Sequence, residues 1–190
     1  MEAVIPRKRV LILGSTGMLG HVTYNVLQNQ SNIELFDMSF RTKLTKKSII
    51  CDVTKVDTLE KQIKKINPVV IVNCVGVLLK NSKINPANTI FINSYLPHKL
   101  RDIAVKINAR VIQISTDCVF NGNRGHNNEN TLPNASDIYG RSKSLGELNN
   151  SFDLTIRTSI IGPELKHNGE GLLHWLFNQS GNIYGYKNVF

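Results

Sequence analysis

The sequence predicts an α/β fold built on a parallel, doubly wound sheet, and three observations support this prediction. Short apolar segments alternate with amphipathic helical segments, which is typical of parallel α/β sheets. Residues 69–74 are β-branched and apolar on both faces, as a central strand of such a sheet requires. A glycine-rich turn stands between the first predicted strand and the first predicted helix. Together these features indicate a Rossmann-type fold with helices on both faces of the sheet.

The expected elements follow from the apolar spacing and from the turn residues between them. Val56, Leu59 and Ile63 have helical spacing, and Pro68 ends that helix before the central strand. Residues 121–134 are polar and rich in Asn and Gly, which indicates a surface loop. The predicted strands are 10–13, 33–36, 48–51, 69–74, 110–115, 154–158 and 182–184. The predicted helices are 18–28, 54–66, 87–108, 138–148 and 171–178.

Length and composition fit one globular domain, or one domain and part of a second. The chain has 190 residues, of which 41% are hydrophobic and 19% charged. It has no apolar run of the ~20 residues that a membrane span needs, and residues 1–9 lack the apolar stretch of a secretory signal. Cys51, Cys74 and Cys118 form no C-x-x-C pair. We therefore expect a cytoplasmic protein with no metal site, no disulfide framework and no membrane association.

The net charge of +9 is spread over several short basic runs rather than gathered in one stripe. No aromatic residues interleave these runs, so the pattern does not favour a nucleic-acid partner. A basic surface also attracts small anionic ligands such as a dinucleotide or a nucleotide-linked sugar. These are the ligands that we expect.

The glycine-rich turn is a G-x-x-G-x-x-G run formed by Gly14, Gly17 and Gly20. Gly14 permits a tight turn, Gly17 lets backbone N–H groups approach a pyrophosphate, and Gly20 lets the helix pack closely on the strand. The N-terminus of the following helix adds positive potential. The placement between a strand and a helix predicts a dinucleotide site.

The choice between NADH and NADPH depends on residues after the second strand. Asp37 is expected to end that strand, where an acidic residue would bind a ribose 2′-hydroxyl. Arg41 and Lys43 follow and could instead bind a 2′-phosphate. The positive sign of this cluster favours NADPH, with NADH as the open alternative.

Several further segments resemble the extended short-chain dehydrogenase/reductase family, in the order and on the elements that the family uses. They are Asp52-Val-Thr54, Asn73-Cys-Val-Gly76, Ile92-Asn93, Ser115-Thr-Asp-Cys-Val-Phe120, Tyr139-Gly-Arg-Ser-Lys143 and Arg157-Thr-Ser-Ile-Ile-Gly162. Segment 115–120 is similar to the S-T-D-Y-V-F signature of dTDP-4-dehydrorhamnose reductases. The resemblance implies that Asp52 binds the adenine amino group and that Asn93 steadies the backbone of the active site.

The resemblance also implies which residues bind and react. The implied cofactor-binding residues are Gly14, Thr16, Gly17, Met18, Leu19, Arg41, Asp52, Val53, Cys74, Val75, Gly76, Tyr139 and Lys143. The implied substrate-binding residues are Asp117, Cys118, Val119 and Phe120. The implied catalytic residues are Thr116, Tyr139 and Lys143.

The chemistry of reduction explains these residue types. Tyr139 and Lys143 are four residues apart on one helix and therefore share a face. A free tyrosine has a pKa of about 10. Because a nearby ammonium favours the phenolate, we expect Lys143 to lower the pKa of Tyr139 and suit it to general acid catalysis. Thr116, at the carboxyl end of its strand, is expected to hydrogen-bond the substrate carbonyl.

Cys118 stands where the dTDP-4-dehydrorhamnose reductases carry tyrosine. Related epimerase/reductases have a cysteine at this place and use it for proton transfer beside the carbonyl. That chemistry requires a second group, for which His167 and His174 are the candidates. The alternative is a small buried cysteine that only packs under the sugar.

The sequence thus predicts NADPH-dependent reduction of a nucleotide-linked 4-keto-6-deoxy sugar, as in dTDP-rhamnose and polysaccharide biosynthesis. Two alternatives remain open: a bifunctional epimerase/reductase that uses Cys118, and a non-catalytic regulatory subunit resembling the methionine adenosyltransferase β subunit. We expect residues 1–162 to form the NAD(P)-binding domain and residues 163–190 to begin the substrate-binding region. The resemblance implies that most of the C-terminal substrate lobe is absent, so that the chain is a fragment, and that a homodimer can form.

Overall fold

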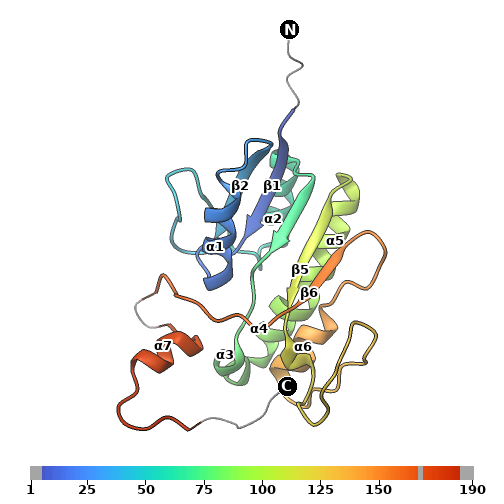
Figure 1. Cartoon of the computed structure of the whole chain (residues 1–190). Coiled ribbons are helices and arrows are strands. Elements are labelled where there is room, and N and C mark those ends of the chain that lie inside the picture. Colours follow the sequence, from blue (N-terminus) through green and yellow to red (C-terminus); the bar gives the residue numbers. More distant parts are fainter. Residues whose placement is uncertain (1–5, 167–168, 185–190) are drawn as a thin grey trace.

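The computed structural model describes residues 6–166 and 169–184, which form a six-stranded parallel sheet with helices on both faces (Figure 1). The strands are β1 (Lys8–Leu13), β2 (Ile33–Ser39), β3 (Ile49–Ile50), β4 (Val70–Asn73), β5 (Arg110–Ser115) and β6 (Leu154–Arg157). Their order is β3-β2-β1-β4-β5-β6. Successive strands are therefore added toward one edge of the sheet from β1 to β3 and toward the other edge from β4 to β6. Doubly wound folds bind ligands at this change, between β1 and β4, at the carboxyl ends of the strands. The predicted fold class is confirmed.

The helices are α1 (Met18–Leu27), α2 (Val56–Ile66), α3 (Leu79–Ile84), α4 (Pro86–Ile90), the π-helix Phe91–Tyr95, α5 (Leu96–Lys106), the 3₁₀-turn Asp117–Val119, α6 (Ile138–Leu145) and α7 (Leu172–Phe177). Helix α1 packs on one face of the sheet, and α2 and α5 pack on the other (Figure 1). In the described part of the chain, no helix has the length and apolar character to span a bilayer.

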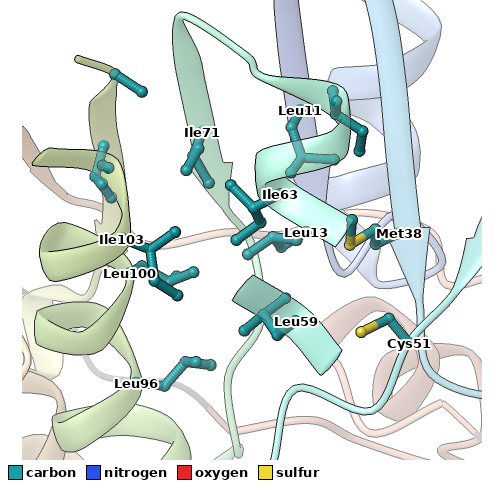
Figure 2. Close-up of a cluster of buried hydrophobic side chains, with 14 of the residues drawn as sticks. Leu11, Leu13, Met38, Cys51, Leu59, Ile63, Ile71, Leu96, Leu100 and Ile103 are labelled. Carbon is teal, nitrogen blue, oxygen red and sulfur yellow. The ribbon is translucent and has the colours of Figure 1, made fainter. Parts of the chain in front are cut away.

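The two faces are separated by the alternation of side chains along β1. Leu11 and Leu13 point toward α2 and α5, where they join the larger core with Leu59, Ile63 and Leu100 (Figure 2). The intervening residues of β1 point toward α1 and form a smaller cluster. The four buried residues of β1 are all apolar, so this central strand presents no polar face to either layer of helices.

Four predicted details differ from the structure. The helix predicted over 87–108 is divided, because residues 91–95 widen into a π-helix. Helix α3 was not predicted, since six residues are too few to show a period. Helix α6 stops at Leu145 rather than at 148, because Gly146 packs against the π-helix. Residues 182–184 form no strand within the described segments.

The packing of α1 on β1 depends on two glycines. Gly14 has φ of +78°, a left-handed conformation that strains other residues. A Cβ added at Gly20 would lie 2.1 Å from the carbonyl oxygen of Gly14. The first turn of α1 can therefore approach the glycine-rich loop only without a side chain at position 20.

Gly20→Ala should destabilise the fold by roughly 1–3 kcal/mol, because the methyl group must displace the backbone of the loop. The gain of about 1 kcal/mol in helix propensity does not offset this cost. Gly125→Ala is the matched control, since a Cβ there meets nothing within 4 Å. Urea unfolding measures both variants, and a Gly20→Ala variant as stable as wild type would contradict the packing described here.

Candidate cofactor and catalytic site

The glycine-rich loop runs from the end of β1 into α1 and is fixed to the neighbouring strand. The backbone N–H groups of Gly14 and Ser15 donate to the carbonyl oxygen of Met38, at 2.8 and 3.1 Å. Gly17 is the N-cap residue of α1 and has no side chain to cap it. The first N–H groups of α1 thus face the edge of the sheet without a side-chain cap, which suits an anionic ligand.

The prediction that Asp37 ends β2 is wrong. The strand continues to Ser39, and the Asp37 side chain lies within the sheet with only 4% of the residue exposed. Its carboxylate accepts a hydrogen bond of 2.6 Å from the Ser15 hydroxyl, so it holds the glycine-rich loop instead of reaching outward. Arg41 lies beyond the strand end, is exposed, and stacks over the Phe40 ring at 4.7 Å.

Asp52 and Val53 lie in the connection between β3 and α2. One Asp52 carboxylate oxygen accepts from the N–H and the hydroxyl of Thr54, at 2.9 and 2.7 Å. These bonds hold the turn before α2, and Asp52 remains partly exposed. It can therefore act both as a turn residue and as a ligand-facing group.

The segment after β4 forms the opposite wall of the same edge. Asn73 donates to the Gln113 side chain at 2.7 Å and accepts from the N–H of Val75 at 3.2 Å. Asn93, from the π-helix, accepts from the N–H of Val77 at 2.8 Å and donates to its carbonyl oxygen at 3.0 Å. Asn93 thus fixes the backbone next to Gly76, as the family resemblance implies.

The three residues implied as catalytic come together at the carboxyl end of β5. Thr116 directly follows that strand and is buried. The Lys143 ammonium donates to the carbonyl oxygen of Ile114, two residues earlier. Tyr139 lies one helical turn before Lys143 on α6, and the Thr116 side chain acts on the pKa of its phenol. The four-residue spacing had predicted that Tyr139 and Lys143 share a helix face, and the family resemblance had implied the place of Thr116.

Burial dominates the electrostatics of this cluster. It lowers the pKa of Lys143 from 10.5 to about 8, against the attraction of the Glu147 carboxylate. It also raises the pKa of Tyr139, an effect that a hydrogen bond from Thr116 opposes and that Cys118, Asp117 and Asp137 reinforce. The expectation that Lys143 lowers the pKa of Tyr139 is therefore wrong for this structure, because Lys143 is directed at the Ile114 carbonyl.

The residues implied as substrate-binding separate into two groups. Asp117 and Cys118 are exposed and Phe120 is partly exposed, whereas Val119 is fully buried and contributes packing. Burial alone would raise the pKa of Asp117, but hydrogen bonds to its carboxylate, chiefly from Ser159, hold the pKa below its usual value.

Cys118 is not a buried packing residue, because its side chain is exposed. Partial desolvation and the negative charge of Asp117 raise the pKa of its thiol, despite a hydrogen bond from Thr116. The thiol is therefore protonated at neutral pH, which suits a proton donor better than a base. Of the two histidines considered as its partner, His167 lies outside the described residues and His174 lies in α7.

Other residues of the site had not been identified from the sequence. Asp137 caps α6 by accepting from the N–H of Gly140 at 3.0 Å. An Asp directly before a predicted helix is a common N-cap, so the sequence could have predicted this role. A Cβ at Gly140 would lie 2.3 Å from the carbonyl oxygen of Cys118, so α6 is docked directly on the reactive segment. Glu147 and Ser159 act through contacts far apart in the sequence, which no local pattern predicts.

The sequence profile of one protein family, described as the RmlD substrate binding domain, matches residues 8–177. The methionine adenosyltransferase 2 subunit beta of Bos taurus is 29% identical over 200 residues, which cover 100% of this chain and 59% of that protein. A dTDP-4-dehydrorhamnose reductase of Aggregatibacter actinomycetemcomitans is 26% identical over 141 residues, covering 73% of this chain and 45% of that protein. The chain thus spans less than two thirds of the length of these relatives.

Solved structures share the fold. A hypothetical dTDP-4-dehydrorhamnose reductase from Sulfolobus tokodaii superposes with a TM-score of 0.72 at 29% identity, covering 78% of this chain and 55% of that one. The dTDP-4-dehydrorhamnose reductase of Bacillus anthracis in complex with NADP gives a TM-score of 0.68 at 23% identity, covering 82% of this chain and 54% of that one. At that identity the second likeness supports the fold alone.

The depressed pKa of Lys143 makes the stability of the fold depend on pH. Burying the ammonium costs about 3 kcal/mol below pH 8, from the difference between 10.5 and about 8, and this cost disappears as the pH rises toward 10.5. Wild type should therefore gain stability relative to Lys143→Met between pH 8 and 10.5. Urea unfolding at a series of pH values measures this difference, with the exposed Lys47→Met as control. A difference that stays constant with pH would contradict the burial of a charged Lys143.

Proposed function

The chain belongs to the RmlD substrate binding domain family, and we propose that it binds NADPH and reduces a nucleotide-linked 4-keto-6-deoxy sugar. The observation that carries this proposal is the grouping of Thr116, Tyr139 and Lys143 at the same sheet edge as the glycine-rich loop. A tyrosine and a lysine on one helix face, beside a dinucleotide loop, are the groups that carbonyl reduction requires.

The residues of the sheet edge fit a dinucleotide. The uncapped N-terminus of α1 is suited to the pyrophosphate. Gly17 has no side chain between the loop backbone and this ligand, and a Cβ added there would also crowd the Gly14 carbonyl oxygen, at 3.2 Å. Exposed Arg41 is available for a 2′-phosphate, whereas Asp37 is engaged with Ser15, and this difference supports NADPH over NADH. In this proposal the backbone at Thr16, Met18 and Leu19 contacts the phosphates. Asp52 and Val53 would contact the adenine, and Cys74, Val75 and Gly76 the nicotinamide half.

The proposed chemistry assigns one task to each catalytic residue. Bound NADPH supplies the hydride for the keto carbon. Thr116 donates a hydrogen bond to the keto oxygen and orients it. Tyr139, which burial keeps protonated near neutral pH, delivers its phenolic proton to that oxygen. Lys143 donates a hydrogen bond to the Ile114 carbonyl oxygen and would contact the nicotinamide ribose.

The substrate side of the proposed site is formed by exposed groups around the same strand end. Asp117, Cys118 and Phe120 are accessible there, with Val119 packing beneath them. In the proposed organisation, residues 1–162 bind the cofactor and residues 163–190 begin the substrate-binding region. The enzyme would be cytoplasmic, where NADPH and nucleotide sugars are available.

Oxidation of NADPH in the presence of nucleotide-linked 4-keto-6-deoxy sugars tests the proposed function. We expect a loss of absorbance at 340 nm that depends on both the protein and the sugar. Tyr139→Phe should lower kcat by roughly 10²–10⁴-fold, because the proton donor is lost. The NADPH affinity should hardly change, and Tyr24→Phe in α1 should leave both quantities as in wild type. An unchanged kcat in Tyr139→Phe would contradict the proposed mechanism.

A second candidate function is that of a non-catalytic regulatory subunit. It is favoured by the fact that relatives named methionine adenosyltransferase 2 subunit beta match the full chain. The same measurements separate the two functions. A protein that binds NADPH in calorimetry, yet consumes none with any keto-sugar tested, would favour regulation and would contradict the reductase.

Epimerisation through Cys118 leaves a separate trace, because a proton is removed beside the carbonyl and replaced from solvent. The raised pKa of Cys118 disfavours the thiolate that such an exchange needs. We therefore expect no solvent deuterium in the sugar when the protein is incubated in D₂O with oxidised cofactor and keto-sugar. Mass spectrometry measures the incorporation. Incorporation that Cys118→Ser abolishes would show that the enzyme is a bifunctional epimerase/reductase.

A further inference from the structure

A carboxylate just beyond α6 makes three hydrogen bonds that the proposed reaction does not use. Glu147 accepts from the Ser115 hydroxyl at 2.7 Å and from Arg157 through two guanidinium nitrogens, at 2.8 and 2.7 Å. The side chains of Glu147 and Arg157 are only 11% and 22% exposed. Both charges are thus largely removed from water. A buried ion pair is costly unless its geometry is good.

These bonds join three segments of the proposed site. Ser115 is the last residue of β5 and directly precedes Thr116. Arg157 ends β6, and its guanidinium lies 5.2 Å from the centre of the Phe120 ring. Glu147 follows α6, the helix that carries Tyr139 and Lys143, and these elements lie next to one another in Figure 1.

The end of α6 is also fixed from the other side. Gly146, directly before Glu147, packs so closely on the π-helix that a Cβ would lie 1.9 Å from the Asn93 carbonyl oxygen. The Ser142 hydroxyl donates to the Tyr139 carbonyl oxygen within α6, and it accepts a hydrogen bond from the Asn93 side chain at 3.2 Å. Helix α6 is therefore held between the π-helix and the Glu147 contacts, so a change at Glu147 acts on the placement of its reactive residues.

We propose that Glu147 is a positioning residue: through Ser115 and Arg157 it holds Thr116, directly after β5, and Lys143, on α6, in a fixed relation. Its carboxylate also attracts the Lys143 ammonium. This inference rests on the proposed function, because it concerns the same reactive residues. Glu147 does not touch the substrate or the cofactor in this arrangement.

The charges around Lys143 support this role. Two ionisable groups act on its ammonium among the described residues: Glu147 beyond α6 and Cys74 after β4. Burial raises the pKa of Cys74 to about 12, so that thiol is neutral under ordinary conditions. Tyr139, on the same helix, is likewise protonated near neutral pH because burial raises its pKa. Glu147 therefore supplies the negative charge that opposes the deprotonation of Lys143.

Titration of Lys143 in Glu147→Gln separates a charge and positioning role from a merely structural one. The probe is the ¹³Cε resonance of Lys143 in lysine-labelled protein, assigned by its absence in Lys143→Met. Loss of the carboxylate with the packing preserved should move the Lys143 midpoint below that of wild type, because the attraction of Glu147 for the ammonium is removed. A looser structure would instead hydrate the ammonium and move the midpoint upward. A midpoint that rises or does not move overturns the proposal.

Because Glu147→Gln leaves Arg157 unpaired and partly buried, this variant can fail to fold. The double variant Glu147→Gln/Arg157→Gln removes both charges, so that neither is left unpaired, and it should show the same downward shift. Glu60→Gln is the matched control, since Glu60 forms ion pairs with Lys64 and Lys106 on α2 and α5 at 2.8 Å. Its Lys143 midpoint should equal that of wild type.

Kinetics give the second readout. A displacement of about 1 Å can cost ~10²-fold in rate, so kcat should fall in Glu147→Gln by up to that factor while KM for the sugar hardly changes. If kcat fell only in proportion to the loss of folded protein, the positioning role would be overturned. The Lys143 titration needs no cofactor or substrate. If wild type consumed no NADPH, the proposed function would fail. The titration would still show whether Glu147 acts on Lys143, so the two proposals can fail separately.

Discussion

The parallel pairing of β1, β4 and β5 is the constraint on which the site depends. Their register aligns Leu13 with Asn73, and Asn73 with Gln113. The segments that follow these strands therefore begin side by side at one edge of the sheet. The N–H of Cys74 donates to the carbonyl oxygen of Leu13, at 3.0 Å, and so continues this pairing beyond β4. Backbone pairing thus brings together the glycine-rich loop, the wall after β4 and Thr116, and side-chain hydrogen bonds then fix these segments.

Burial at this edge changes the chemistry of the side chains that meet there. Away from water, the ammonium of Lys143 and the phenolate of Tyr139 are both disfavoured, so the pKa of lysine falls while that of tyrosine rises. The pKa values of the two groups, 10.5 and 10.0 in water, are thus driven further apart in the site. The carboxylate of Glu147 opposes part of this effect on Lys143. The arrangement favours a protonated Tyr139 as the acid of the proposed reduction.

Local sequence patterns predicted the parts of the fold that depend on local physics. Apolar runs gave the six strands, and the spacing of glycines gave the loop whose close packing requires Gly20. The errors arose where distant contacts decide the outcome. Asp37 is held inside the sheet by Ser15, 22 residues away, and this partner cannot be inferred from the end of a strand pattern. The four-residue spacing of Tyr139 and Lys143 predicted a shared helix face, but not that Lys143 reaches the Ile114 carbonyl.

We propose that a dinucleotide lies across the edge formed by β1, β4 and β5. Amide chemical shifts of ¹⁵N-labelled protein, followed while NADPH is added, test this claim most directly. We expect the largest shifts in residues 14–20, 74–77 and 115–118, with smaller changes around Arg41. The contrary result would be shifts concentrated at the hollow lined by Arg9, Glu34 and Lys65, where α2 packs against β1 and β2, or no shifts at all.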